Sequence, residues 1–185
     1  MLLSYLCRQT QSVGFMKKII IIGATSGIGR GLAEQYACED CLIGITGRRE
    51  NLLKEICAQD KDKLFYQVCD ITHTETTISS LETLVQEMGG MDMLIISAGT
   101  GELNPQLSYQ LEEPTLLTNV VGFTNIAGWG FRYEETKPFA SVACAVSSAG
   151  HCRGVYRGFR QSEFLYRHIL DLPVPGAALS LIHIS

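Results

Sequence analysis

Four isoleucines in a row, Ile19 to Ile22, precede a turn that contains three glycines and then a run of helix-forming residues, in the stretch IIIIGATSGIGRGLAEQYA. A short β-branched run with no polar residue on either face is typical of a strand that is buried on both sides. Gly23, Gly27 and Gly29 remove side chains where the strand gives way to the helix. This stretch predicts a strand, a tight turn and a helix that packs back against the strand.

Strand-like and helix-like segments alternate along the chain to about residue 146. Expected strands cover 18–22, 42–46, 64–69, 93–97 and 140–146, and expected helices cover 27–38, 50–59, 75–88 and 111 to about 131, the last with Pro114 in its opening turn. Apolar strands that alternate with helices favour right-handed crossovers and a parallel sheet. We therefore predict an α/β fold, a Rossmann-like doubly wound parallel sheet with helices on both faces, whose ligands bind at the carboxyl ends of the strands.

Composition narrows the class of protein. The 185-residue chain is 46% hydrophobic and 18% charged, which is typical of a globular domain with a substantial core. A formal net charge of −4 does not favour a nucleic-acid or anionic-membrane partner, and no apolar run is long enough to cross a bilayer. In residues 1–15 the one Arg follows the apolar residues, unlike a secretory signal. We expect a cytoplasmic protein in which 1–15 is a non-native or disordered extension before Met16.

The cysteines favour the same compartment. Seven is an odd number, and the cysteines are scattered through apparent strands and helices, as reduced intracellular thiols are. Cys38 and Cys41 have CxxC spacing, but no second pair or His cluster completes a tetrahedral metal site. We expect two partly buried thiols there and no metal.

The glycine turn is a candidate phosphate site. In such a unit Gly23 permits the tight turn, Gly27 lets backbone N–H groups approach a pyrophosphate, and Gly29 allows close packing of helix on strand. The free N–H groups and the positive end of the helix dipole then attract a phosphate. An ordinary glycine-rich turn is the alternative, but its place at the start of a βαβ series favours a dinucleotide site.

GATSGIG resembles the glycine motif of the short-chain dehydrogenase/reductase family, with Ile22 where that family usually has Thr. The other matches, in chain order, are Asp70 and Ile71 in VCDIT, Ala98 and Gly99 in IISAGTG, Asn119 in LLTNVVGF and Ser148 in AVSSAG. In IISAGTG, Ile96 and Ser97 replace the two Asn residues of the family. The matches cover about residues 17–150 and define a dinucleotide-binding domain over 16–149.

The resemblance implies an NAD(P)-dependent oxidoreductase that interconverts a carbonyl and an alcohol by hydride transfer, with a small-molecule substrate and, for the full-length enzyme, a homo-oligomeric state. It implies cofactor binding by Gly23, Thr25, Ser26, Gly27, Ile28, Gly29, Arg48, Arg49, Asp70, Ile71, Ala98 and Gly99. It also implies that Asn119 holds a water of the proton relay and that Ser148, next to Ser147, orients the substrate.

Two arginines bear on the choice of cofactor. Arg48 and Arg49 follow the second expected strand, where a fold that selects NAD usually has an acidic residue. The fixed donors of a guanidinium suit a 2′-phosphate, so the sequence favours NADP(H) over NAD(H), with Arg48 as the better candidate. An exposed arginine pair at a helix start is the alternative interpretation.

The acid/base residue is the weakest match. The family uses a Tyr four residues before a Lys, which lowers the pKa of the phenol. Beyond Ser148 the nearest imitation is Tyr156 with Arg160, which lies too close to Ser148 and has Arg in place of Lys. Tyr156 is therefore the candidate acid/base, with packing as its other role. The alternative function is a non-catalytic, regulatory dinucleotide-binding module.

From about residue 150 the strand–helix rhythm is lost. HCRG shifted by one nucleotide, and RHILDL after small insertions or deletions, read like sequence of the same family. We interpret 150–185 as an irregular, doubtful segment, a frame-shifted and prematurely ended read of a longer enzyme, so that the fold is incomplete at the C-terminus.

Resequencing the source DNA tests this interpretation. We expect an inserted or deleted nucleotide near codon 150 and, in the restored frame, a Tyr–Lys pair of the family. An open reading frame that continues as printed would refute it.

Overall fold

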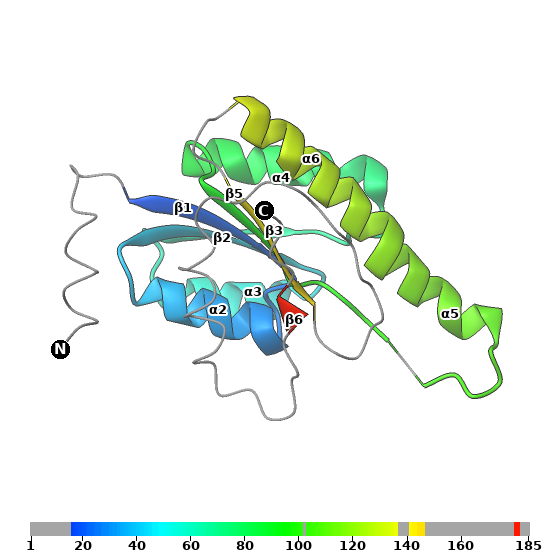
Figure 1. Ribbon diagram of the computed structural model, residues 1–185. Coiled ribbons are helices and arrows are strands. Elements are labelled where there is room, and N and C mark those ends of the chain that lie inside the picture. The colour runs from blue at the N-terminus through cyan, green and yellow to red at the C-terminus, as the bar shows by residue number, and fades with distance from the viewer. Residues whose placement is uncertain (1–15, 102, 137–140, 147–179, 182–185) are drawn as a thin grey trace.

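A computed structural model describes residues 16–101, 103–136, 141–146 and 180–181 (Figure 1). The strands are β1 (Lys17–Ile22), β2 (Cys41–Gly47), β3 (Leu64–Val68), β4 (Met93–Ile96), β5 (Ser141–Val146) and β6 (Ser180–Leu181). The helices are α2 (Gly27–Ala37), α3 (Glu50–Cys57), α4 (Thr74–Met88), α5 (Tyr109–Leu116), the π-helical segment η2 (Leu117–Gly122) and α6 (Phe123–Thr136).

The strands form one sheet in the order β3-β2-β1-β4-β5-β6. Pairing is parallel from β3 through β5, which confirms the predicted α/β fold with a doubly wound parallel sheet. The two-residue β6 pairs with β5 in the antiparallel direction and was not predicted from the sequence. Strand order reverses between β1 and β4, because β1 leads to β2 on one side and β4 leads to β5 on the other.

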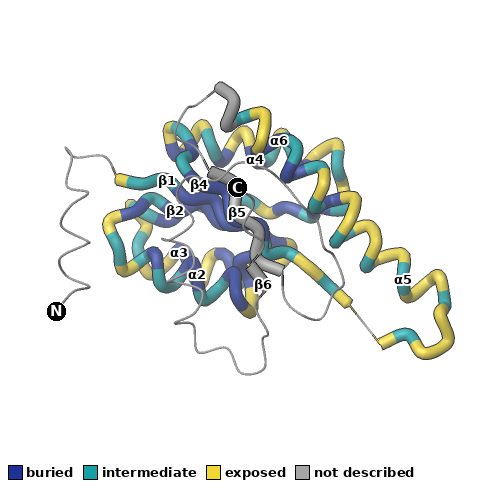
Figure 2. The backbone as a smooth tube through the Cα atoms, viewed as in Figure 1, coloured by how far each residue is buried: buried dark blue, intermediate teal, exposed yellow. Residues whose placement is uncertain are grey.

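The isoleucine run of β1 supplies both faces of the core. Ile19 and Ile21 belong to the apolar cluster beneath α2 and α3, and Ile20 and Ile22 belong to the cluster beneath α4 and α6. All four side chains are 0% exposed. Figures 1 and 2 show these helix pairs on opposite sides of the buried sheet. Helices cover both faces, which explains why no polar residue interrupts the isoleucine run.

The long helix begins earlier than the sequence predicts. Ser108 stands at the N-cap of α5, and Asn104 fixes this start by accepting from the Ser108 N–H and donating to the Ser108 carbonyl and the Glu112 carboxylate. Pro114 therefore lies inside α5, not in its opening turn as predicted, and removes one N–H from the helical hydrogen-bond ladder. The π-helical η2 follows within three residues, so the backbone of this helix is irregular from Pro114 to Gly122.

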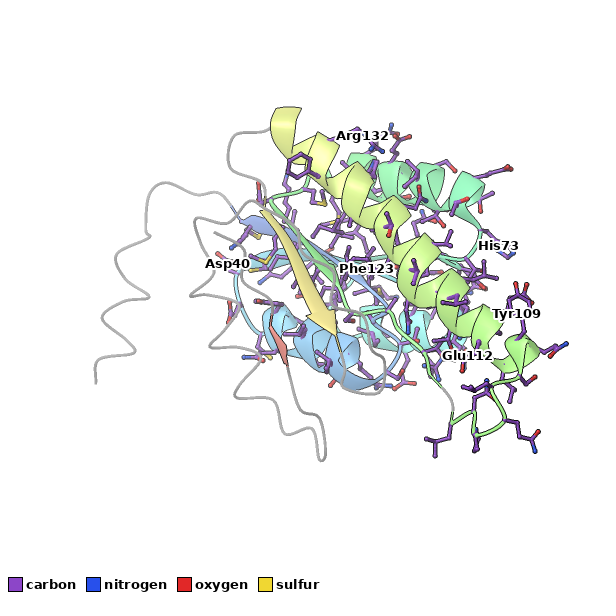
Figure 3. All side chains as sticks on the ribbon, turned by 45° about the vertical axis from the view of Figure 1, so that its right-hand side comes forward. Asp40, His73, Tyr109, Glu112, Phe123 and Arg132 are labelled. Atoms are coloured by element: carbon purple, nitrogen blue, oxygen red, sulfur yellow. The ribbon has the colours of Figure 1, made fainter. Side chains whose placement is uncertain are left out.

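The amino-terminal half of this helix projects past the sheet and carries exposed apolar side chains (Figures 1 and 2). Those on the preceding loop, α5 and η2 are Leu103, Leu107, Tyr109, Leu111, Leu116, Leu117, Val120 and Val121. Figure 3 shows Tyr109 and Glu112 at the far end of this projection. Among the described residues, none of the helices has the length and apolarity required to span a membrane.

The fit of α4 against the sheet depends on Leu84. Its side chain is 0% exposed and packs over Gly44 of β2, where a Cβ would lie 2.9 Å from Leu84 Cδ2. Leu84→Ala should lower the free energy of unfolding by about 2–5 kcal/mol because it leaves a cavity at a crowded contact. Urea denaturation measures the loss, and Gln86→Ala, on the exposed side of α4, should stay within about 0.5 kcal/mol of the original.

Candidate functional site

The carboxyl ends of β1, β2 and β4 converge on the turn between β1 and α2. The N–H groups of Gly23 and Ala24 both donate to the Thr46 carbonyl at the end of β2, over 3.0 and 2.9 Å. On the other side, the Ser97 N–H donates to the Ile22 carbonyl over 2.9 Å, and the Ser97 hydroxyl donates to the same oxygen over 3.0 Å. The turn is thus fastened to both neighbouring strands at the point where strand order reverses.

The three glycines meet different constraints. Gly23 has φ +85°, and a Cβ there would lie 2.7 Å from the backbone of Ala98. A Cβ on Gly29 would overlap the Gly23 carbonyl oxygen and the Ser97 hydroxyl. Gly27 has φ +56°, but a Cβ there would find no described atom within 4 Å. Gly23 and Gly29 are therefore required by packing, whereas Gly27 borders open space at the start of α2.

In the part of the chain that the structure describes, the amino terminus of α2 has no side-chain cap. Ser26 stands at its N-cap in an extended conformation, and its side chain makes no capping hydrogen bond. The first turn of α2, which includes the buried Ile28, has no acidic residue. Because no side chain among the described residues caps these N–H groups and the first turn of α2 has no carboxylate, the turn fits a phosphate group.

The two arginines after β2 have different surroundings. Arg49 donates from Nη2 to Thr25 Oγ1 and to Ser26 Oγ, over 2.8 and 2.9 Å, so its guanidinium reaches back to the glycine turn. Arg48 is exposed, as Arg49 is, but its charge acts on the carboxyl group of Asp70 beyond β3. The sequence could place both arginines near the turn but could not separate these two environments.

Asp70 closes the turn that follows β3. Its carboxylate accepts from the Thr72 N–H over 3.0 Å and from the Thr72 hydroxyl over 2.8 Å. Burial alone raises the pKa of this carboxyl, but the Thr72 bonds and the charges of Arg48 and His73 outweigh it and hold the pKa below its ordinary value. Stability from these contacts is complete above the ordinary pKa and is lost as pH falls through the lowered one.

Asn119 lies in η2 and joins it to the loop after β4. Its Oδ1 accepts from the Thr100 N–H over 2.9 Å, and its Nδ2 donates to the Thr100 carbonyl over 2.6 Å. A Cβ on Gly99 would lie 3.5 Å from the same Oδ1, so the loop passes close to the amide. The polar residue that the sequence places on an apolar helix is therefore paired, as a half-buried amide requires.

The two remaining catalytic candidates, Ser148 and Tyr156, lie outside the described residues. A second tyrosine has the family's spacing to a Lys: Tyr133 stands four residues before Lys137. Its hydroxyl accepts from the Met91 N–H over 3.2 Å, which places it at the amino ends of the strands. Tyr133 therefore does not belong to the site formed by the carboxyl ends.

The CxxC pair is also remote from this site. Cys38 is exposed at the C-cap of α2, and Cys41 is buried at the start of β2. Asp40, between them, lies at the opposite end of the molecule from His73, which precedes α4 (Figure 3). Burial raises the pKa of the Cys41 and Cys57 thiols to about 11. Over the part of the chain that the structure describes, no three His, Cys, Asp or Glu residues are grouped to hold a metal ion.

Fold and site together define a Rossmann-like α/β domain with an open glycine turn at a helix amino terminus. The chain belongs to the short chain dehydrogenase family, whose sequence model matches residues 17–156. This confirms the family resemblance derived from the motifs.

Individual proteins are similar to the chain in sequence or in fold. It is 28% identical over 141 residues to a diacetyl reductase [(S)-acetoin forming] of Staphylococcus epidermidis, covering 73% of this chain and 55% of that protein. Its fold is similar to that of a short-chain dehydrogenase of Streptomyces avermitilis, with a TM-score of 0.67 and 20% identity over 71% of this chain and 49% of that one. The F189W actinorhodin polyketide ketoreductase with NADPH has a TM-score of 0.63 at 19% identity, covering 70% of this chain and 52% of that one. The chain spans about half the length of these proteins.

The glycine constraints predict unequal effects of the same substitution. Gly23→Ala combines a left-handed φ with a clash against the Ala98 backbone, so it should lower the free energy of unfolding by about 2–5 kcal/mol. Gly27→Ala meets no neighbour and should lower it by only about 1–2 kcal/mol. Thermal and urea denaturation of the two variants measure the difference. Equal losses would contradict the assignment of Gly27 to open space.

Proposed function

We propose that this chain is an oxidoreductase domain that interconverts a carbonyl and an alcohol with a nicotinamide dinucleotide, preferring NADP(H). The observation that carries the proposal is the glycine turn. Backbone hydrogen bonds hold it to the ends of β2 and β4, while among the described residues Gly27 borders open space and no side chain caps α2. Family membership and the reductase name of the staphylococcal relative support the hypothesis of an enzyme over that of a regulatory module.

The cofactor residues take complementary parts in this proposal. The backbone of Gly23–Gly29, with the hydroxyls of Thr25 and Ser26, binds the pyrophosphate at the start of α2. Asp70 and Ile71 bind the adenine end, and Ala98 and Gly99 border the dinucleotide beyond β4. When bound, the dinucleotide supplies or accepts a hydride at its nicotinamide ring.

The remaining residues handle the substrate and the proton. Ser148 orients the substrate oxygen by a hydrogen bond, and Tyr156 is the candidate that gives a proton to that oxygen or takes it away. Asn119 holds the relay water while its amide fixes the loop at Thr100. The contacts of Asn119 with Thr100 leave one amide hydrogen and one lone pair for that task.

The preference for NADP(H) rests on charge at the end of β2. The place of the usual ribose-binding acid is held by Arg48, whose guanidinium is exposed and electrostatically coupled to Asp70. A 2′-phosphate adds negative charge that Arg48 can bind through two parallel donors. The similar fold crystallised with NADPH, the polyketide ketoreductase, supports the same choice.

The substrate class is a small molecule with a carbonyl or alcohol group. The name of the staphylococcal relative makes diacetyl and acetoin the first compounds to assay. A cytoplasmic location and a homo-oligomeric full-length enzyme belong to the same proposal.

Cofactor preference is tested at Arg48. Arg48→Gln should weaken binding of NADP⁺ about 10- to 100-fold, the equivalent of one charge-assisted contact, and should leave NAD⁺ binding unchanged. Lys54→Gln is the matched control, because it removes the same charge from exposed α3 outside the site. Calorimetric titration of both dinucleotides measures the ratio. A ratio that Arg48→Gln does not alter contradicts the preference assigned to Arg48.

Turnover separates the enzyme from the regulatory module. NADPH oxidation is followed with diacetyl and a panel of aldehydes and ketones. Reduction of any of them, with NADPH consumed in equal amount, supports the enzyme. NADPH binding without turnover across the panel, by the printed chain and by the chain in the restored frame, favours the non-catalytic module. Absence of binding counts against both.

A further inference from the structure

Arg49 bridges two segments that the fold brings together at the carboxyl ends of β1 and β2. Its Nη2 donates to Thr25 Oγ1 over 2.8 Å and to Ser26 Oγ over 2.9 Å, and its Nε lies 3.3 Å from Thr25 Oγ1. One guanidinium thus bonds both hydroxyls of the glycine turn. The bridge joins the start of α3 to the turn between β1 and α2, 23 and 24 residues away in sequence.

Both ends of this bridge are held in place. The Arg49 backbone forms the N-cap of α3, where its carbonyl accepts from the N–H groups of Leu52 and Leu53 over 3.1 and 3.2 Å. Thr25 is only 8% exposed, and a Cβ on Gly47 would lie 2.6 Å from its Cγ2, so β2 presses against the turn. The guanidinium therefore joins two constrained anchors and restricts the turn between them.

The bridge also determines what the two hydroxyls can offer a ligand. Each hydroxyl has one hydrogen to donate and lone pairs that accept. Because Thr25 and Ser26 accept from Arg49, their own hydrogens remain to be donated to an oxygen. Ser26 is the N-cap of α2 but makes no capping bond, so its hydroxyl is not spent on the helix. Arg49 thus favours the orientation in which both hydroxyls act as donors beside the α2 amino terminus.

We propose that Arg49 is a positioning residue for the dinucleotide diphosphate: it acts through Thr25 and Ser26 to hold the glycine turn in its phosphate-accepting form before a ligand binds. This proposal rests on the proposed function. It gives different roles to the two arginines that are adjacent in the sequence. Arg49 strengthens binding of NADP(H) and NAD(H) by the same factor, whereas Arg48 discriminates between them.

The alternative is direct contact of Arg49 with the 2′-phosphate. That contact would require Arg49 to give up its bonds to Thr25 and Ser26 and would leave the turn less restrained. The charge of Arg48 already acts on Asp70, the residue predicted to bind the adenine end. The bonds of Arg49 to Thr25 and Ser26 keep its guanidinium at the turn, so Arg48 is the arginine favoured at the 2′-phosphate.

Calorimetric titration with NADP⁺ and with NAD⁺ distinguishes the two roles. Arg49→Gln should weaken the binding of both dinucleotides by the same factor, about tenfold, because the lost bridge holds the part of the site that both dinucleotides contact. Arg49→Lys should give a smaller loss for both, since an ammonium keeps the charge without the fork. A loss confined to NADP⁺ overturns the proposal and assigns Arg49 to the 2′-phosphate, and unchanged affinities for both also overturn it.

Hydrogen exchange of the ligand-free chain gives a readout that does not depend on the cofactor. The Gly23 and Ala24 amides, which donate to Thr46, should exchange faster in Arg49→Gln, while amides in α4 keep their rates. The double variant Thr25→Val, Ser26→Ala removes the acceptors and should reproduce this effect. Adding Arg49→Gln to it should change little more, because the three side chains act as one unit. If the effects of Arg49→Gln and of the double variant on these exchange rates are fully additive, the proposal is overturned.

Two further outcomes test the role of Arg49 and the proposed function. General acceleration of exchange, or loss of folding in both Arg49→Gln and the double variant, contradicts a role confined to the turn. If the unmodified chain binds neither dinucleotide, the proposed function fails. Exchange at Gly23 and Ala24 then still reports whether Arg49 restrains the turn, so the two failures are told apart.

Discussion

The backbone contact between Gly23 and Ala98 is the constraint on which the site depends. A Cβ at Gly23 would lie 2.7 Å from Ala98, so the turn after β1 and the loop after β4 touch without an intervening side chain. Ser97 extends the contact by bonding the Ile22 carbonyl with both its N–H and its hydroxyl. As a result, β1 and β4 remain paired up to the point where the chain departs to opposite faces. Open parallel sheets bind ligands at the carboxyl ends of two neighbouring strands whose following connections run to opposite faces.

The irregular long helix secures the loops on the other side of that edge. Asn119 pairs with the Thr100 backbone after β4, and a Cβ on Gly122 would lie 2.6 Å from the Ile71 carbonyl after β3. Both residues lie in η2, where wider helical winding alters the direction of successive side chains. One segment therefore touches the loops of two strands that are not neighbours in the sheet, and it fixes them relative to each other without a covalent link.

How far the sequence predicts this structure depends on the range of the interactions. The isoleucine run and the glycine turn reflect local geometry and burial, so they predicted β1, α2 and the parallel sheet, with element ends within a few residues. Pro114 was misplaced because the start of α5 is set by the Asn104 side chain, which a search for helical periodicity does not detect. The bridge from Arg49 to the turn joins residues more than twenty positions apart, and only the folded β1–β2 pair brings them together. The same limit applies to Asn119: its place was predicted from the resemblance, but its partner Thr100 was not.

The cysteine thiols differ in exposure, so the rates at which they are alkylated report how often the fold opens around each of them. Of the four cysteines whose side chains the structure describes, Cys38 is exposed and Cys41, Cys57 and Cys69 are buried. Burial raises the pKa of all three buried thiols, so the reactive thiolate is scarce at neutral pH even where reagent could enter. An alkylating reagent will therefore modify Cys38 at once and the others only as fast as the strands and helices around them separate. Because Cys57 lies under one face of the sheet and Cys69 under the other, their separate rates of modification compare the lifetimes of the two halves of the core.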